Sequence, residues 1–124
     1  MVKKTQSIQE TAVLAVEEDD AFTSLCSNLA EINKHPEATG YILRNATTAI
    51  VDLKNPERLT EYAILASQTL ESAQEISELF NLGTIENILI TGKDTKTLCI
   101  TRGENNATIF MEKTADHEDI ESQI

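Results

Sequence analysis

The chain has few of the residues from which phosphate-binding active sites are built. Only four of its 124 residues are glycine, and it has no tryptophan. A phosphate-binding loop needs several glycines close together, and neither the dinucleotide fingerprint nor the Gly-Lys-Ser/Thr loop occurs. The Gly-x-Ser-x-Gly nucleophile elbow is also missing. We therefore predict a protein that is not an enzyme, with no catalytic residue and no cofactor.

Metal-binding and secretory signals are equally scarce. Two cysteines, Cys26 and Cys99, and two histidines, His35 and His117, have no spacing typical of zinc ligands, so no metal site is predicted. Unpaired thiols among apolar neighbours are typical of a reducing compartment. The apolar run at residues 12–16 soon meets an acidic run and is too short for a signal peptide or a membrane span. We expect a cytoplasmic protein with no membrane insertion.

Basic residues are outnumbered by acidic ones, 10 against 21, which gives a formal net charge of -11. Nucleic acid and anionic membrane surfaces both require a basic patch, so neither is expected as a partner. An excess of acid permits a partner with a basic face, although it also serves solubility.

The longest periodic stretch runs from Asn55 to Gly83 and predicts a long helix. Asn55 and Pro56 suit its start, and Gly83 suits the left-handed residue beyond its end. One stripe collects its apolar residues at helical spacing: Leu59, Tyr62, Ala63, Ala66, Leu70, Ala73, Ile76 and Phe80, widened by Leu65, Thr69 and Leu79. The far side is acidic, except for Ile64. Because this arc is wider than one sheet face needs, we expect the helix to serve a sheet and a second surface.

The rest of the chain predicts one helix, five strands and a short terminal helix. The first helix follows an acidic run, and its buried face is formed by Phe22, Leu25, Cys26, Leu29 and Ile32. Strands are expected at 39–44, 48–53, 85–91, 95–102 and 107–113, with the long helix between the second and third. In the last three strands, Ile88 and Ile90 are expected to share a face with Leu98 and Ile100. Leu89 is expected on the other face with Cys99 and Phe110.

These elements predict an α+β domain with a five-stranded, mostly antiparallel sheet, in a sandwich-like arrangement of the roadblock or profilin type. The order is helix, two strands, long helix, three-stranded meander and short helix. The domain is assigned to residues 20–124. Residues 1–19 are an N-terminal extension for which a short helix and an extra strand remain open.

Several segments together resemble the roadblock-type domain family, which includes the roadblock dynein light chains and prokaryotic regulators of Ras-like small GTPases. The resemblance lies in the order and length of these segments: Phe22-x-x-Leu25-x-x-x-Leu29, Thr39–Leu43, Pro56–Leu82, Ile85–Ile90 and Leu98–Thr101. Two features depart from the family pattern. The first hairpin turn has no Asp-Gly pair, and the last helix is unusually acidic.

The resemblance implies a homodimer in which the long helix and the third strand meet their copies. The candidate dimer or partner interface comprises Ala63, Ala66, Leu70, Ala73, Ser77, Ile88 and Ile90. It further implies a non-enzymatic protein that binds and regulates or scaffolds a Ras-like small GTPase. No motif marks Arg44, Arg58 or Arg102 as an arginine finger.

Two other functions remain open at this point. One is a small-molecule-sensing module of profilin-like or PAS-like shape, which requires a cavity between the sheet and the helices. The other is a structural adaptor subunit of a motor or transport complex, which the same dimer would serve.

Overall fold

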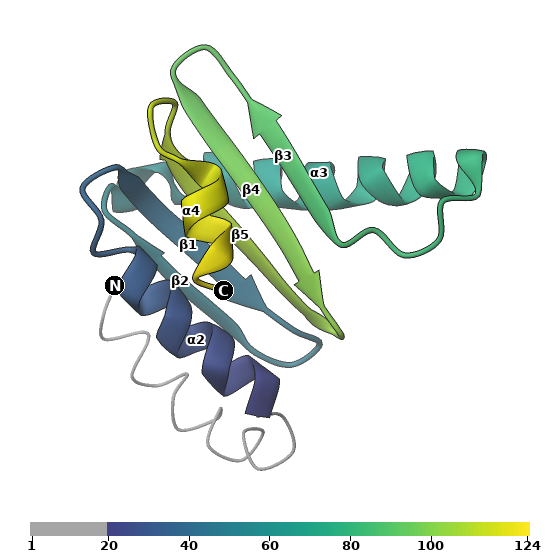
Figure 1. The fold of residues 1–124 in the computed structure, drawn as a ribbon, viewed down its shortest axis with the longest axis horizontal. Coiled ribbons are helices and arrows are strands. Elements are labelled where there is room, and N and C mark those ends of the chain that lie inside the picture. The colour runs from purple at the N-terminus through teal and green to yellow at the C-terminus, as the bar shows by residue number, and fades with distance from the viewer. Residues whose placement is uncertain (1–19) are drawn as a thin grey trace.

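A computed structural model describes residues 20–124, which form one sheet covered by helices on both faces (Figure 1). The predicted extension, residues 1–19, lies outside the described residues. The elements follow the predicted order, with α2 at Asp20–Ile32, α3 at Leu59–Phe80 and α4 at His117–Ser122.

The sheet has five strands in the order β2-β1-β5-β4-β3, and all neighbouring strands are antiparallel. Their bounds are β1 Ala38–Arg44, β2 Ala49–Leu53, β3 Asn87–Thr91, β4 Thr95–Arg102 and β5 Asn105–Glu112. Because α3 connects β2 to β3, the chain crosses from one edge of the sheet to the other through the long helix. The predicted α+β fold is confirmed.

None of the three hairpin turns contains an Asn-Gly or Asp-Gly pair, and two of them show how the turn closes without one. In the β1–β2 turn, the Asn45 side-chain oxygen accepts hydrogen bonds from the backbone N–H groups of Thr47 and Thr48, each at 2.9 Å. This is an Asx turn, which closes a loop without glycine. In the β4–β5 turn, Gly103 takes a φ of 63°, which suits the first position of a type II′ turn.

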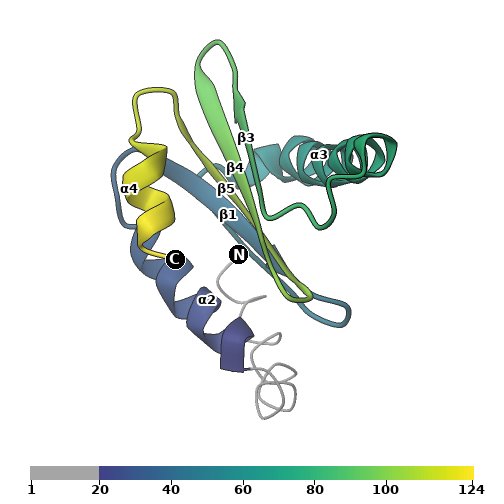
Figure 2. The same ribbon diagram turned by 45° about the vertical axis from the view of Figure 1, so that its right-hand side comes forward.

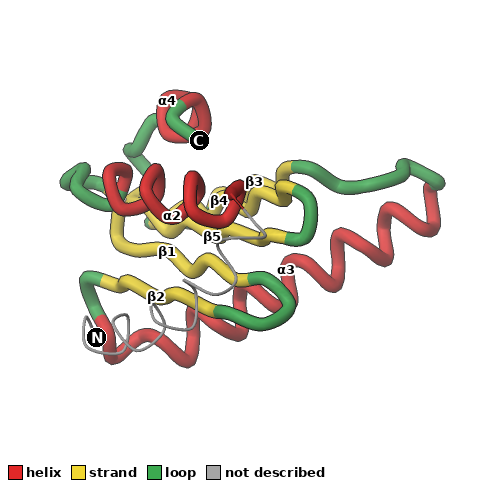
Figure 3. The backbone as a smooth tube through the Cα atoms, turned by 90° about the horizontal axis from the view of Figure 1, so that it is seen from below, coloured by secondary structure: helices red, strands yellow, loops and turns green. Residues whose placement is uncertain are grey.

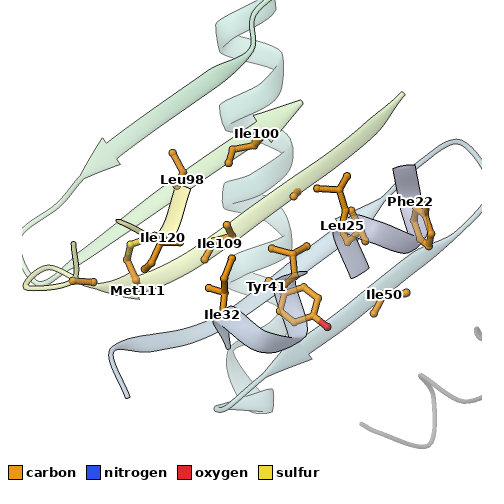
Figure 4. Packing of buried hydrophobic residues seen from close by; sticks show 14 residues of the cluster. Phe22, Leu25, Ile32, Tyr41, Ile50, Leu98, Ile100, Ile109, Met111 and Ile120 are labelled. Atoms are coloured by element: carbon orange, nitrogen blue, oxygen red, sulfur yellow. The ribbon is translucent and has the colours of Figure 1, made fainter. Parts of the chain in front are cut away.

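One face of the sheet holds the larger hydrophobic core, under α2 and α4 (Figures 2 and 3). The predicted face of α2 is confirmed, since Phe22, Leu25, Leu29 and Ile32 are all buried and Cys26 is half-buried. Their side chains pack onto Tyr41, Ile50 and Ile109 of the strands (Figure 4).

The short helix α4 closes the far end of the same face. Asp116 caps it by accepting hydrogen bonds from the N–H groups of Glu118 and Asp119. Ile120 is buried in the core. Lys96 on β4 donates to the carbonyl of Ala115 at 2.7 Å, and the amide of Asn87 on β3 donates to Glu121 at 2.9 Å. These two bonds attach α4 to the β3 side of the sheet.

The opposite face of the sheet packs on the first half of α3. Pro56–Arg58 forms a 3-10 turn, and the α-helix begins at Leu59. The smaller core on this face contains Ile42, Leu53 and Phe110, with Leu59, Tyr62 and Leu65 of α3 packed against them. Asn55 precedes the turn as predicted, but it accepts the first hydrogen bond with its backbone carbonyl, from the N–H of Arg58 at 3.0 Å.

The helix α3 ends two residues earlier than its glycine predicts. Asn81 takes the left-handed conformation, with a φ of 56°. The N–H of Leu82 bonds to the carbonyl of Ser77, and the N–H of Asn81 bonds to that of Glu78, which is a Schellman motif. The left-handed cap is therefore Asn81, because asparagine tolerates this conformation; Gly83 follows with a positive φ of its own.

The predicted faces of β3 are wrong. In the β3–β4 pairing, Ile88 lies opposite Cys99, Ile90 opposite Thr97, and Leu89 opposite Leu98. Ile88 and Ile90 therefore lie on the α3 side of the sheet, and Leu89 lies on the α2 side. The reason is the turn, which places four residues between the paired Thr91 and Lys96. A connection with an even number of residues pairs even-numbered positions with odd ones, which reverses the faces expected from the sequence.

Candidate interaction surface

The helix α3 runs across the sheet and extends beyond the edge strand β3 (Figures 1 and 3). At a rise of about 1.5 Å per residue, its 22 residues are about 33 Å long. Five strands spaced about 4.8 Å apart cover only about 19 Å between the first and last. Because the helix crosses the strands and is longer than the sheet is wide, one end of it extends past the sheet.

The predicted apolar stripe of α3 consequently divides into two parts. In the first half, Ala66 and Thr69 are buried against the sheet. In the second half, Ile76 is 51% exposed and Phe80 is 70% exposed. Both have the helical spacing of the sheet-facing residues, so they are exposed because no strand lies beneath them. The sheet therefore covers only part of the apolar arc, in line with the expectation that the helix serves a sheet and a second surface.

Beside this projecting end lies an unprotected sheet edge. The strand β3 reads Asn87-Ile88-Leu89-Ile90-Thr91, with neither a charge nor a proline, and it has a sheet neighbour on one side only. Leu89 and Ile90 are exposed. Charges and prolines are the usual devices that prevent another strand from pairing with an edge. The edge strand β3 has neither of them.

A groove of about 590 Å³ lies between the second half of α3 and the sheet. It is lined by α3, by the connection from α3 to β3, and by the β4–β5 turn. The wall on the connection side is held by the Ser77 hydroxyl, which donates a hydrogen bond to the carbonyl of Gly83.

Four of the seven predicted interface residues meet in this groove, namely Leu70, Ala73, Ser77 and Ile88. The other three do not. Ala66 is only 3% exposed and faces the sheet of its own chain. Ala63 and Ile90 are exposed but lie outside the groove.

The predicted set omitted the most exposed apolar side chains of this region. Ile76, Leu79, Phe80 and Leu82 surround the projecting end of α3, and Leu89 lies on the edge strand. Ile76, Leu79 and Phe80 belong to the apolar arc predicted from the sequence, but the predicted interface does not include them. The sequence signal that could have identified them is the length of α3 relative to the width of a five-stranded sheet.

The cysteines lie away from this surface and from each other. Cys99 is on the α3 side of the sheet, where burial raises its pKa and a contact from the Thr108 hydroxyl at 3.6 Å partly opposes the rise. Cys26 is on α2, beyond the other face, and burial raises its pKa also. Burial raises the pKa of Tyr41 on the same face. Within residues 20–124, no three histidine, cysteine or acidic side chains form a group that could hold a metal ion.

None of the helices in residues 20–124 has both the length and the apolar character needed to cross a membrane.

The sequence matches no protein-family model and no curated protein. Solved structures, in contrast, share the fold. A roadblock/LC7 domain from Streptomyces avermitilis is 15% identical, with a TM-score of 0.64 over 77% of this chain and 84% of that one. The gliding protein MglB from Thermus thermophilus is 14% identical, with a TM-score of 0.62 over 82% and 81%. Myxococcus xanthus MglB is 11% identical, with a TM-score of 0.64 over 85% and 82%.

These likenesses extend over most of the residues that form the fold described above. At such low identity they establish the architecture and leave the individual activity open. The chain has the roadblock/LC7 fold.

Proposed function

We propose that this protein is a non-enzymatic homodimer that binds a Ras-like small GTPase and regulates or scaffolds it. The observation that carries the dimer is the end of α3, which projects past the sheet (Figure 3) and bears the exposed residues Ile76 and Phe80. The resemblance to the roadblock family supports the GTPase as partner.

A second copy of the chain fits this surface for three reasons. The sheet-facing side of the α3 end is apolar, and the adjacent strand β3 is uncharged, so two copies meet without repulsion. A two-fold axis beside β3 pairs two identical antiparallel edges, as an isologous contact requires. The same axis carries the end of each α3 over the β3 strand of the other copy. Both the edge strand and the projecting stripe are then covered by one contact.

The arginines are consistent with a regulator that acts on the partner's own catalytic groups. Arg58 is paired with Glu61, with 2.7 Å between nitrogen and oxygen. Arg102 donates to the carbonyl of Thr101 at 3.0 Å. Neither lines the groove. In this proposal the dimer surface positions the GTPase and contributes no arginine finger.

The proposal is tested by two measurements on the full chain. Sedimentation equilibrium over a range of concentrations is expected to give the mass of a dimer. Ras-like GTPases from the same genome are expected to bind the protein in pull-downs, and GTP hydrolysis is compared with and without it. A monomer at all concentrations would contradict the dimer. A dimer that binds none of those GTPases would contradict the assigned partner alone.

A small-molecule sensor is the second candidate, and the groove favours it. Its volume of about 590 Å³ falls within the range of about 300–1,000 Å³ that ligand sites occupy. A ligand screen by thermal shift separates the candidates, because a sensor is stabilised by its ligand whether or not a GTPase is present. The third candidate, a structural adaptor of a motor or transport complex, remains a proposal. The genes that neighbour this one would distinguish an adaptor from a regulator of a GTPase. The cytoplasmic location also stays a prediction.

A further inference from the structure

The side of α3 that points away from the sheet carries a second stripe. One margin of it is Glu78, which also lines the groove, and the other margin is Leu79 of the apolar arc. The proposed dimer contact through Ile76, Phe80 and β3 does not include this stripe. We call it the outer stripe, and its members recur at helical spacing: Ile64, Gln68, Glu71, Glu75, Glu78 and Leu79. All six are exposed. The two apolar members lie at the two ends of the stripe along the helix, and Ile64 is 57% exposed and Leu79 79% exposed. Three glutamates occupy the length between them.

The charges of this stripe are uncompensated within residues 20–124. The helix has no lysine, arginine or histidine from Leu59 to Phe80, and no basic residue in its last turn. The ion pairs of this part of the chain involve Glu31 and Glu61. Like charges three and four residues apart destabilise a helix, and so does negative charge near its C-terminus. Glu71, Glu75 and Glu78 therefore oppose the stability of α3 unless a cation is brought from outside.

A second copy of the chain is a poor occupant for this stripe. Two α3 helices packed through their outer stripes would place glutamates against glutamates, since both helices carry the same charges. The neutral surface formed by Ile76, Phe80 and β3 has no such conflict. Charge therefore divides α3 into one side that suits self-association and another that suits a different partner.

We propose that the outer stripe binds an amphipathic helix of another protein with a basic centre and apolar ends. Ile64 and Leu79 are separated by about 15 residues of helix, or about 22 Å. The partner helix would present apolar side chains at about that separation and lysine or arginine at three positions between them. Helices that pack side by side bring such residues into contact at about 8–10 Å between axes. This inference goes beyond the proposed function and does not depend on a GTPase being the partner.

The chemistry of the stripe is tested with a designed peptide. The probe is a labelled helical peptide of about 20 residues with leucines at both ends of one face and three lysines between them. Its affinity for the full-length protein is measured by fluorescence anisotropy in low salt. A second peptide, with glutamine in place of lysine, serves as the comparison. We expect the lysine peptide to bind at least about tenfold more tightly. Equal affinity, or no binding by either, would overturn the proposal.

A matched pair of protein variants locates the binding. Glu71→Gln, Glu75→Gln and Glu78→Gln together remove three charges from the stripe. The control combines Glu104→Gln, Glu112→Gln and Glu118→Gln, which removes the same charge from exposed positions elsewhere. We expect the first variant to lose about tenfold in affinity and the control to change little. Equal losses would show general attraction to an acidic protein and would overturn the stripe as the site.

Two further measurements test the role of Ile64 and Leu79 and the separation of the outer stripe from the dimer contact. Ile64→Ser with Leu79→Ser is expected to weaken the lysine peptide although the charges are intact; unchanged affinity would contradict the apolar anchors. The variant that combines Glu71→Gln, Glu75→Gln and Glu78→Gln is expected to have the same mass in sedimentation as the unmodified protein. A change in its oligomeric state would place the stripe in the contact between copies and overturn the proposal.

Discussion

The ring of Tyr62 on α3 stacks on the ring of Phe110 in β5, with centroids 4.1 Å apart and planes inclined by 15°. The Arg58 guanidinium lies over the same tyrosine ring, 5.2 Å from its centroid. This stack lies in the smaller core, at the start of α3. It fixes one end of a helix whose other end extends past the sheet.

The stack is expected to couple the stabilities of its two residues. A double-mutant cycle of Tyr62→Leu and Phe110→Leu, followed by urea unfolding, is expected to give a coupling of about 1 kcal/mol, typical of aromatic pairs. Phe110→Leu alone is expected to destabilise more than Tyr62→Leu, since Phe110 is fully buried and Tyr62 is not. A coupling near zero would mean that the rings contribute only through separate burial.

The contact between copies is expected to depend on the projecting residues of α3. Phe80→Glu and Ile76→Glu each place a charge on the neutral side of the helix and are expected to give folded monomers in sedimentation. Because both side chains are exposed within the chain, the circular dichroism of the monomer should stay native. Lys113→Glu, on an exposed position past β5, is the matched control and should remain a dimer. Dimers of unchanged mass in both α3 variants would refute the placement of the contact.

Ala66 is unsuited to that test, although it belongs to the predicted interface. Its side chain faces the sheet of its own chain, so Ala66→Glu would bury an unpaired charge and unfold the protein whatever the oligomeric state.

Gly40 is expected to tolerate no side chain. A Cβ there would lie 2.6 Å from Cδ2 of Leu53 and 2.8 Å from the carbonyl oxygen of Asp52, at the last pair of the β1–β2 ladder. We expect Gly40→Ala to lower the free energy of unfolding by about 3 kcal/mol, through overpacking and backbone strain. Gly83→Ala is the control for the strain alone, because its φ is also positive but no atom lies within 4 Å. It should cost only about 1 kcal/mol. Equal losses would contradict the steric argument.

The connection from α3 to β3 is expected to loosen when the Ser77 hydroxyl is removed. Ser77→Ala eliminates the hydrogen bond to the Gly83 carbonyl and is expected to destabilise by about 1 kcal/mol. Hydrogen exchange should accelerate in residues 82–86 and stay unchanged in β1 and β5. Uniform acceleration across the sheet would show that Ser77 supports the whole fold and not this wall of the groove.

Stability is expected to fall at alkaline pH through the buried thiols. Burial raises the pKa of Cys26 and Cys99, so the unfolded chain releases their protons first. The free energy of unfolding is therefore unaffected by these groups below about pH 8.5 and declines as the pH rises above it. Urea unfolding at about pH 7 and about pH 9.5 measures the decline, which should be smaller when both cysteines are replaced by alanine. An equal decline in both proteins would assign it to other groups, among them Tyr41.

Much of the fold follows from local patterns in the sequence. Leu25, Leu29 and Ile32 recur at helical spacing and are buried on α2. The alternation of Leu98 and Ile100 places them in the core, and the unbroken period after Pro56 gives the long helix. These features depend on the spacing of residues that are close together in the chain, so they can be predicted directly from the sequence.

The candidate surface was predicted only in part, since it depends on distances that no local pattern contains. Of the predicted interface residues, Leu70, Ala73, Ser77 and Ile88 line one groove, whereas Ala66 is buried within its own chain. The exposure of Ile76, Leu79 and Phe80 could not be read from periodicity. A stripe has the same spacing whether or not a sheet lies under it.

The sequence by itself determined the order of the elements, the amphipathic faces of α2 and α3, and the acidic character of the outer stripe. Each of these is a property of residue type and spacing. Only the tertiary structure decided which face Ile88 and Leu89 occupy, because that depends on the register of the β3–β4 turn. It also decided that Phe80 lies beyond the sheet, because that depends on where α3 crosses the five paired strands.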